Sequence, residues 1–498
     1  MIKALCSRIY GKEQLREDLI QLNRLVKTED MREAFLDEFY ENESFYLELL
    51  DEEDPKVRKN AVKLLACVGD SASLEPLWQH YLSEKTRFLR ADYLEAFKSF
   101  DMTPHIKTLE NMWEEMTKKD AGDKHDQAES RKLRELIWMK HPPQKHRFRY
   151  PKEKSRLCFI VPRGTEEMAA QAMDAAIVQK MSGGFISEVA AEDFRQVIQS
   201  RVYQSLLFDF CPKLITGKDG VPDGKKAGAI LMGEGLLDFL DRLHESNGRP
   251  YVFRVDVKGI REPAVKNRIA REVSQTLEEM GEGRLVNDAS HFEMEIRMLY
   301  SKRMDCRVFL KLYTLPDRRF TYRKQILPVS MQPSRAALML AFAGKELKDD
   351  ANVLDPFCGS GVLLIERARM AGYRSLYGLD IYRPALDACE ANSRNAKIRI
   401  QTIQRDFSDF RHEYPFDEIV TDMPRKSENH SAEDIGYIYR KFFDRISHWM
   451  GKTGVILLYS EEDRLIRDNI KRHEELRLKG TLPLTASGYA YLIHYGKE

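Results

Sequence analysis

The chain has 498 residues, which is enough for roughly two to four domains. Its 80 Lys and Arg residues against 79 Asp and Glu residues give a formal charge of +1, so any nucleic-acid surface must be a local patch. Long apolar runs and an N-terminal secretory signal are both missing and the 7 cysteines are scattered, so we expect a cytoplasmic protein with no membrane span, disulfide framework or metal site.

The first third of the chain has helical periodicity and no strand pattern. Residues 51–82 and 84–113 share one plan, in which a turn leads into a helix, a break and a second helix. Arg58 and Arg90 fall at matching positions early in the two units. This plan resembles HEAT-type repeats, which stack because one unit cannot bury its own apolar face. We therefore expect a HEAT-like helical domain over residues 1–145, with an irregular helical bundle as the alternative.

The segment from about Met116 to Pro151 is charged and poor in apolar residues, and it contains consecutive prolines. Prolines break helices and mixed charge keeps a segment solvated, so a linker is expected here. At its end, basic residues alternate with Phe148 and Tyr150. The alternative interpretation is that this end contacts RNA phosphates and bases.

Strand and helix patterns alternate in the middle of the chain. LCFIVPRG, YVFRVDV, FEMEIRML and CRVFLKLY predict strands, and residues 263–281 carry a helical apolar stripe. The pattern indicates an α+β region of roughly domain size.

ANVLDPFCGSGVLLIERARMAG, residues 351–372, is the most informative segment. A short apolar strand ends at Asp355, passes through a turn with Gly359 and Gly361, and enters an apolar helix. Glycines let the backbone approach a ligand closely, and a helix N-terminus offers free N–H groups. Many strand-to-helix turns carry Gly-x-Gly, so this feature alone does not identify a ligand site.

Three further predicted strands end in acids, namely Asp380, Asp406 and Asp422. Open parallel sheets bind ligands at the carboxyl ends of their strands, so four acids in register indicate a ligand site. The third glycine of a Gly-x-Gly-x-x-Gly motif is replaced by Leu364 and no Gly-Lys-Ser/Thr is present, which argues against a dinucleotide or a nucleoside triphosphate. LRLKGTLPL and YAYLIHY predict a terminal antiparallel hairpin.

A parallel sheet closed by such a hairpin resembles the class I S-adenosylmethionine-dependent methyltransferases. DPFCGSGVLLIE and its lead-in YRKQILPVSMQPSRAALML are similar to the signature of RNA methyltransferases that carry an N-terminal THUMP domain, including those that methylate guanine N2 in tRNA and rRNA. VPRGTEEMAAQAM and FRVDVKG resemble the THUMP region and its ferredoxin-like neighbour. The resemblance implies a multidomain chain: the helical region at 1–145, a THUMP-like RNA-binding α+β region at 150–325, and a Rossmann-like α/β methyltransferase domain at 326–498.

The resemblance also implies roles for individual residues. Asp355 would contact the amino group of S-adenosylmethionine, Asp380 its ribose hydroxyls and Asp406 its adenine amine. The glycines of the turn would lie against its methionine part. The cofactor-binding residues implied in this way are Asp355, Phe357, Gly359, Gly361, Asp380 and Asp406.

Asp422 and Pro424 match the family's Asn/Asp-x-Pro-aromatic motif, which holds the flipped target base, but Arg425 stands where the aromatic residue is expected. Arg425 could stack its planar guanidinium on the base. Alternatively, Tyr437 or Phe357 takes that role, or the site binds ligand without catalysis. The candidate catalytic residues are Asp422, Pro424 and Arg425.

The resemblance implies a methyltransferase that acts on a base of structured tRNA or rRNA, with guanine N2 favoured and S-adenosylmethionine as the cofactor. The alternative is a catalytically degenerate protein that keeps the fold as an RNA-binding or scaffolding module. The N-terminal helices are expected to offer a surface for a protein partner.

Overall fold

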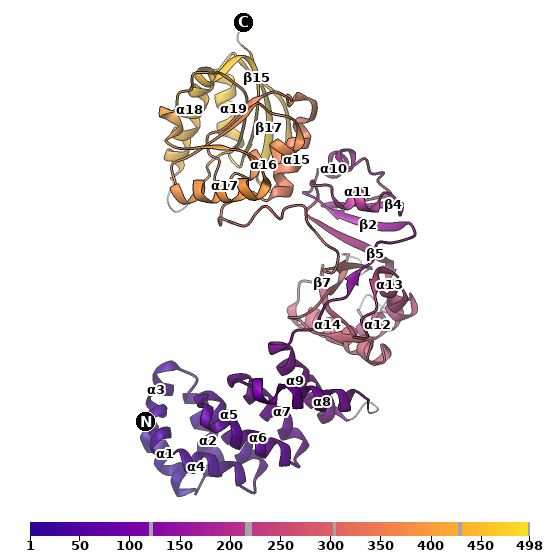
Figure 1. Cartoon of the computed structure of the whole chain (residues 1–498), viewed down its shortest axis with the longest axis vertical. Helices are drawn as coiled ribbons and strands as arrows, with labels where there is room; N and C mark the ends of the chain where they lie inside the picture. Colours follow the sequence, from indigo (N-terminus) through magenta and orange to yellow (C-terminus); the bar gives the residue numbers. More distant parts are fainter. Residues whose placement is uncertain (119–122, 215–221, 302–304, 427–430, 497–498) are drawn as a thin grey trace. The chain divides into compact units, whose positions relative to one another are not determined.

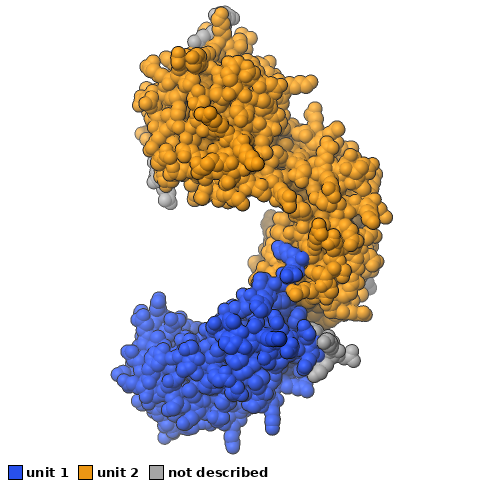
Figure 2. Space-filling view, viewed as in Figure 1, with its two compact units in different colours: residues 1–145 blue, residues 146–498 orange. Residues whose placement is uncertain are grey.

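The computed structural model describes residues 1–118, 123–214, 222–301, 305–426 and 431–496. The chain divides into two compact units, residues 1–145 and 146–498 (Figure 2). Each unit has its own core, and the two are described separately below.

The first unit is helical, as the sequence predicts, and its described residues contain no strand (Figure 1). Arg58 and Arg90 make matching contacts. Each donates to a backbone carbonyl six residues upstream, and each pairs with a glutamate further along the chain, Glu84 and Glu129 respectively. The helices are α1 (Ile2–Gly11), α2 (Leu15–Leu25), α3 (Glu29–Glu41), α4 (Glu43–Glu48), α5 (Pro55–Val68), α6 (Leu74–Ser83), α7 (Arg87–Ala96), α8 (Ile106–Lys118) and α9 (Lys124–Lys140).

The predicted linker is wrong over most of its length. Helix α9 occupies residues 124–140 and buries Leu133, Leu136 and Ile137 on one stripe. Beyond it, Phe148 is 8% exposed and packs on Phe194, so its ring is not free to stack on a base. The charged composition hid a helix that needs only a narrow apolar face.

The middle part of the second unit is built on one mixed sheet with the strand order β3-β4-β2-β5-β10-β9-β7-β8. Its helices bury their apolar stripes against one face of this sheet. The strands are β1 (Arg147–Phe148), β2 (Ser155–Ile160), β3 (Gln179–Met181), β4 (Gly184–Val189), β5 (Ser205–Leu214), β6 (His244–Glu245), β7 (Tyr251–Lys258), β8 (Leu285–Asn287), β9 (Met294–Tyr300) and β10 (Cys306–Leu312), with β1 and β6 forming a separate pair. The helices are α10 (Glu166–Ala172), α11 (Phe194–Ile198), α12 (Gly224–Gly233), α13 (Leu236–Leu243) and α14 (Pro263–Met280).

The C-terminal part has a sheet with the order β13-β12-β11-β14-β15-β17-β16, in which the first five strands are parallel and the last two form the predicted hairpin. Helices α15–α17 pack on one face and α18 and α19 on the other (Figure 1). The elements are α15 (Pro333–Ala343), β11 (Asn352–Asp355), α16 (Val362–Met370), β12 (Ser375–Asp380), α17 (Arg383–Ala396), β13 (Gln401–Gln404), β14 (Phe416–Asp422), α18 (Ala432–Trp449), β15 (Met450–Ser460), α19 (Asp463–Arg472), β16 (Leu476–Pro483) and β17 (Tyr489–Gly496). The switch in strand order between β11 and β14 creates the crevice where open parallel sheets bind ligands.

Candidate functional site

The glycine turn lies between β11 and α16, at this switch point. Gly361 is the N-cap of α16 with φ +77°, and a Cβ on it would lie 2.5 Å from Cys389 Sγ. Gly359 has φ +51° and nothing within 4 Å of a would-be Cβ, so the turn is open on that side. The backbone thus makes a cradle next to the free N–H groups of a nine-residue helix.

Asp355 ends β11 and is 1% exposed. Its Oδ1 accepts hydrogen bonds from Thr421 Oγ1 (2.7 Å) and from the Phe357 N–H (3.1 Å). Burial raises the pKa of Asp355 to about 8, and the charges of Asp422 and Asp380 add to the rise. A cationic group of a ligand would favour the ionised form of Asp355 and offset part of the desolvation penalty of its buried charge.

Asp380 and Asp406 follow on the neighbouring strands. Asp380 accepts hydrogen bonds from the Gly359 N–H (3.0 Å) and the Tyr382 N–H (2.9 Å), so it ties the glycine turn to the end of β12. Asp406 is exposed and accepts from the Ser408 N–H (2.8 Å). Both carboxylates keep lone pairs for a ligand.

Asp422 ends β14 and is placed differently from the other acids. Its Oδ1 is buried and has no hydrogen-bond partner among the described residues. Its Oδ2 lies 3.5 Å from Arg425 Nη2. Burial raises the pKa of Asp422 to about 7, against the lowering effect of Arg425 and Arg335 and with a contribution from Glu461 that raises it further. An unsatisfied buried carboxylate oxygen is costly, which points to a ligand donor that completes it.

Arg425 lies between two carboxylates and above an aromatic ring. Its Nη1 donates to Glu461 Oε1 (3.1 Å), and its guanidinium carbon is 5.9 Å from the centre of the Tyr459 ring. The Tyr459 hydroxyl donates to the same Glu461 oxygen (3.1 Å). The guanidinium is therefore held by Glu461, Asp422 and Tyr459, while its side chain stays 41% exposed.

The loop after β14 is also fixed through its backbone. The Met423 N–H donates to the Tyr459 carbonyl (2.9 Å), and the Tyr439 hydroxyl donates to the Pro424 carbonyl (3.2 Å). Pro424 therefore sets the path of the chain between Asp422 and Arg425.

The two aromatic candidates lie in different surroundings. Phe357 is partly buried in a cluster with Phe407 (4.9 Å between ring centres) and Phe442 (6.1 Å). Tyr437 is 56% exposed on α18, with Lys441 Nζ 5.6 Å from its ring centre. The structure thus links Asp355, Asp380 and Asp422 through their charges and Gly359 to Asp380 through a hydrogen bond. It places Gly361 in the same turn as Gly359 and Arg425 beside Asp422.

Sequence reasoning missed Thr421, Tyr459 and Glu461. The signal for Glu461 was present, because it directly follows the apolar run VILLYS of strand β15, as the four recognised acids lie at or just after the ends of their strands. Within the described ranges, no three His, Cys, Asp or Glu side chains gather in a way that could hold a metal ion. None of the helices described is long and apolar enough to span a bilayer.

Comparison with known proteins agrees with this geometry. Residues 321–481 match the family described as RMKL-like, methyltransferase domain. A tRNA (guanine(10)-N2)-dimethyltransferase of Methanothermobacter thermautotrophicus is 31% identical over 163 residues, which cover 31% of this chain and 47% of that protein. The chain therefore spans about half the length of this curated relative.

Two solved structures share the fold of a large part of this chain. TrmN from Thermus thermophilus has a TM-score of 0.52 and 18% identity, covering 69% of this chain and 99% of that chain. SMU.472 in complex with SAH has a TM-score of 0.50 and 12% identity, covering 70% and 99%.

The residues present suit the cofactor of this fold. The glycine cradle is open, the buried Asp355 suits a cationic group, and the Asp380 carboxylate has lone pairs for hydroxyl donors. Residues 321–481 therefore match a methyltransferase-domain family, and the geometry of the site suits S-adenosylmethionine as the cofactor.

Proposed function

We propose that the protein transfers a methyl group to the N2 amine of a guanine in structured RNA, with tRNA as the first candidate and rRNA as the second. The observation that carries the proposal is the buried Oδ1 of Asp422, which has no hydrogen-bond partner in the described part of the chain and lies next to Asp355 and the glycine turn. The name of the curated relative, a tRNA guanine-N2 enzyme, supports the same acceptor.

The site has two sides. The cofactor side consists of Asp355, residues 356–361 and Asp380, with Asp406 at its edge. The acceptor side consists of residues 422–425 with Tyr459 and Glu461. S-adenosylmethionine supplies a methyl carbon that is already electrophilic because it is bonded to a sulfonium. The protein must therefore align the amine with that carbon and exclude water.

Asp422 provides the alignment in this mechanism. Its free Oδ1 accepts a hydrogen bond from the guanine amine, which directs the nitrogen lone pair away from the carboxylate and toward the methyl carbon. As the new N–C bond forms and the C–S bond breaks, the amine loses a proton. A carboxylate with a pKa of about 7 can take up this proton and release it to water.

A carboxylate also favours guanine over adenine. The Watson–Crick edge of guanine presents its amine next to the N1–H, so two donors face the same direction, whereas adenine presents one donor beside an acceptor. An ionised Asp accepts only, so it matches two donors. A guanine within a helix has to leave its stack to reach the site.

We assign RNA binding to a THUMP-like region at residues 150–325 and protein docking to a HEAT-like domain at residues 1–145, with the methyltransferase domain at 326–498. The distribution of charge supports this division. Residues 146–498 carry 56 Lys and Arg against 50 Asp and Glu, whereas residues 1–145 carry 24 against 29. A net positive unit suits the phosphate backbone, and a net negative one does not.

A binding module without catalysis is the second candidate. The observation that favours it is Arg425, which replaces the expected aromatic residue and is held by Asp422 and Glu461. In this function the Asp422 carboxylate would stay paired with Arg425 and would not receive an amine.

Incubation with methyl-labelled S-adenosylmethionine and total RNA, followed by nucleoside analysis, separates the two functions. We expect label in N2-methylguanosine, and the Asp422→Ala variant should bind the cofactor normally in calorimetry while losing the label. Cofactor binding without labelled nucleosides from any RNA pool would favour the binding module.

A further inference from the structure

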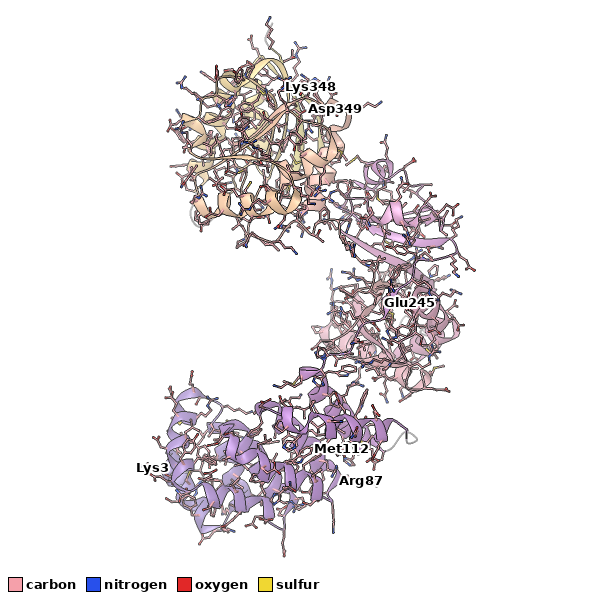
Figure 3. The ribbon with its side chains drawn as sticks, in the orientation of Figure 1. Lys3, Arg87, Met112, Glu245, Lys348 and Asp349 are labelled. Carbon is pink, nitrogen blue, oxygen red and sulfur yellow. The ribbon has the colours of Figure 1, made fainter. Side chains whose placement is uncertain are left out.

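Helix α16 begins at the glycine turn and carries two consecutive buried charges with different partners. Glu366 and Arg367 are 2% and 0% exposed. Arg367 forms an ion pair within the methyltransferase domain, donating to both oxygens of Glu418 on β14 (2.6 and 2.9 Å). It also donates to the Lys348 carbonyl (2.7 Å); Lys348 is labelled in Figure 3. Glu366 instead pairs with a residue of the middle region.

That residue is Arg201, in the turn between α11 and β5. Its Nε and Nη2 donate to the two oxygens of Glu366 (2.6 and 2.7 Å), which is the bidentate geometry that guanidinium and carboxylate prefer. The Tyr322 hydroxyl donates to Glu366 Oε1 (2.6 Å). Burial and the Glu366 charge raise the pKa of Tyr322, so its hydroxyl stays protonated and remains a donor.

A second arginine, Arg319, makes contacts in the opposite direction, from the segment before the methyltransferase domain to the middle region. Arg319 belongs to the segment that leads into the methyltransferase domain. Its Nη1 donates to the carbonyls of Ser200 (3.1 Å) and Tyr203 (2.9 Å) on either side of Arg201, and its guanidinium carbon lies 3.7 Å from the centre of the Tyr203 ring. Arg201 in turn donates to the Arg319 carbonyl. The two arginines therefore interlock the turn at 200–203 with the segment at 319–322.

Opening this contact would leave the Glu366 carboxylate buried with Tyr322 as its remaining side-chain donor among the described residues. A buried carboxylate that loses its cationic partner is strongly unfavourable. The contact is therefore a rigid joint rather than a surface ion pair, and it is attached to the helix whose first residue borders the cofactor turn.

We propose that the Arg201–Glu366 joint holds the middle region in one orientation toward the methyl-transfer site, so that RNA bound by the middle region presents its target guanine to Asp422. Arg201 and Glu366 are positioning residues in this proposal, which rests on the proposed RNA methylation. A misplacement of the order of 1 Å can cost about 100-fold in rate, so a loosened joint is sufficient to impair RNA methylation without any change at the cofactor.

The test compares Arg201→Met and Glu366→Gln with the control Glu418→Gln, which disrupts the ion pair of the neighbouring residue Arg367. Dyes attached through unnatural amino acids at the exposed positions Val178 and Tyr414 report the distance between the two regions by Förster transfer. Each joint variant should broaden the distance distribution and lower kcat/KM for structured RNA roughly 10- to 100-fold. The dissociation constant of S-adenosylmethionine should change less than about twofold, since no cofactor contact is lost.

Glu418→Gln should show the opposite pattern, with a lower melting temperature and a distance distribution as narrow as in the wild type. Arg201→Lys keeps the charge and should restore part of the RNA activity of Arg201→Met. Unchanged distances in both joint variants would overturn the joint, whether or not the wild type methylates RNA. Broadened distances with unchanged kcat/KM for RNA would overturn its role in positioning. Absence of methylation by the wild type would count against the proposed function, while the distances still decide whether the joint exists.

Discussion

The proposed cofactor side and the proposed acceptor side of the site are both built from carboxylates at strand ends, but the hydrogen-bonding capacity of these carboxylates is satisfied in different ways. On the cofactor side, Asp355 and Asp380 accept hydrogen bonds from Thr421 and from the backbone of the glycine turn. On the acceptor side, Oδ1 of Asp422 has no partner in the described part of the chain, and Arg425 is shared between Asp422 and Glu461.

This difference shows which part of the site is already ordered before a ligand binds. The cofactor side is preorganised, because its carboxylates already fix the loop that receives the cofactor. On the acceptor side, Asp422 Oδ1 has no hydrogen-bond donor in the described part of the chain, and Arg425 is partly exposed. A bound base must supply that donor or displace the Arg425 side chain. Changes on the cofactor side should therefore affect cofactor affinity, and changes on the acceptor side should affect turnover.

The largest effect is expected from Asp422→Ala. Removal of a preorganised group that acts on the transition state typically costs about 10²–10³-fold in kcat. We expect a loss of this size in RNA methylation, with S-adenosylmethionine affinity unchanged in calorimetry.

The pH dependence tests the same residue. With a pKa of about 7, Asp422 is mostly protonated below neutral pH and cannot take up the proton of the amine, so the wild-type rate should rise as pH rises through about 7. Asp422→Asn retains a carbonyl acceptor but does not titrate, so its rate should show no rise in this range. An Asp422→Asn profile that matches the wild type would assign the titration to another group.

Gly361→Ala should have the next largest effect, and on the cofactor side. The new methyl group meets Cys389 Sγ at 2.5 Å in a backbone conformation with φ +77°, so the turn must move. We expect S-adenosylmethionine affinity to fall roughly 100-fold, equivalent to about 2.7 kcal/mol, as measured by calorimetry.

Gly359→Ala is the matched control, because its φ is also positive but its would-be Cβ meets nothing within 4 Å. It should cost about 1 kcal/mol of backbone strain in stability and leave a folded turn. Equal losses of affinity in the two variants would mean that backbone conformation, not the close approach to Cys389, limits the turn. Cys389→Ala in the Gly361→Ala background should recover part of the affinity.

The arrangement of the residues on the proposed cofactor side could be predicted from sequence because it is local. Asp355, Gly359 and Gly361 lie in one strand-turn-helix segment, and Asp380 ends the next strand of a regular βαβ series. The terminal hairpin was also predicted correctly, because alternating residues indicate strands directly.

The acceptor side could be predicted only in part, because half of it comes from a different strand. Tyr459 lies at the end of β15 and Glu461 directly after it, some 35 residues after Arg425. No spacing rule links such positions, and their contact depends on the pairing of β14 with β15, in which Asp422 is opposite Tyr459. The helix at 124–140 was missed for a different reason, since its apolar stripe is narrow and its other residues are charged.

Substitutions of Arg425 by Tyr, Lys and Ala separate a stacking role of this residue from a charge role. The expected loss of RNA methylation is smaller than the loss of affinity in Gly361→Ala. If the guanidinium stacks on the base over Tyr459, Arg425→Tyr should keep most of the activity, while Arg425→Lys and Arg425→Ala lose about 10-fold, in line with a stacking contribution of about 1–3 kcal/mol per base. The reverse order, with Lys active and Tyr inactive, would show that Arg425 serves to neutralise Asp422 and Glu461. The measurement is kcat/KM for RNA at the high-pH plateau of each variant, because loss of the Arg425 charge removes an effect that lowers the pKa of Asp422.

The smallest expected effect is a proton released when S-adenosylmethionine binds. In the free protein the pKa of Asp355 is about 8, so at pH 7 roughly nine-tenths of it is protonated. If the cofactor's ammonium group binds the ionised form, the bound state has the lower pKa and nearly one proton leaves at pH 7. The affinity should then rise about fivefold from pH 7 to pH 8 and level off above it. Calorimetry in buffers of different ionisation enthalpy measures this proton directly, and Asp355→Asn should abolish the buffer dependence. Wild-type binding with no proton release would show that Asp355 stays neutral in the complex, so that the cofactor side recognises its ligand through the glycine turn and Asp380 without a buried charge.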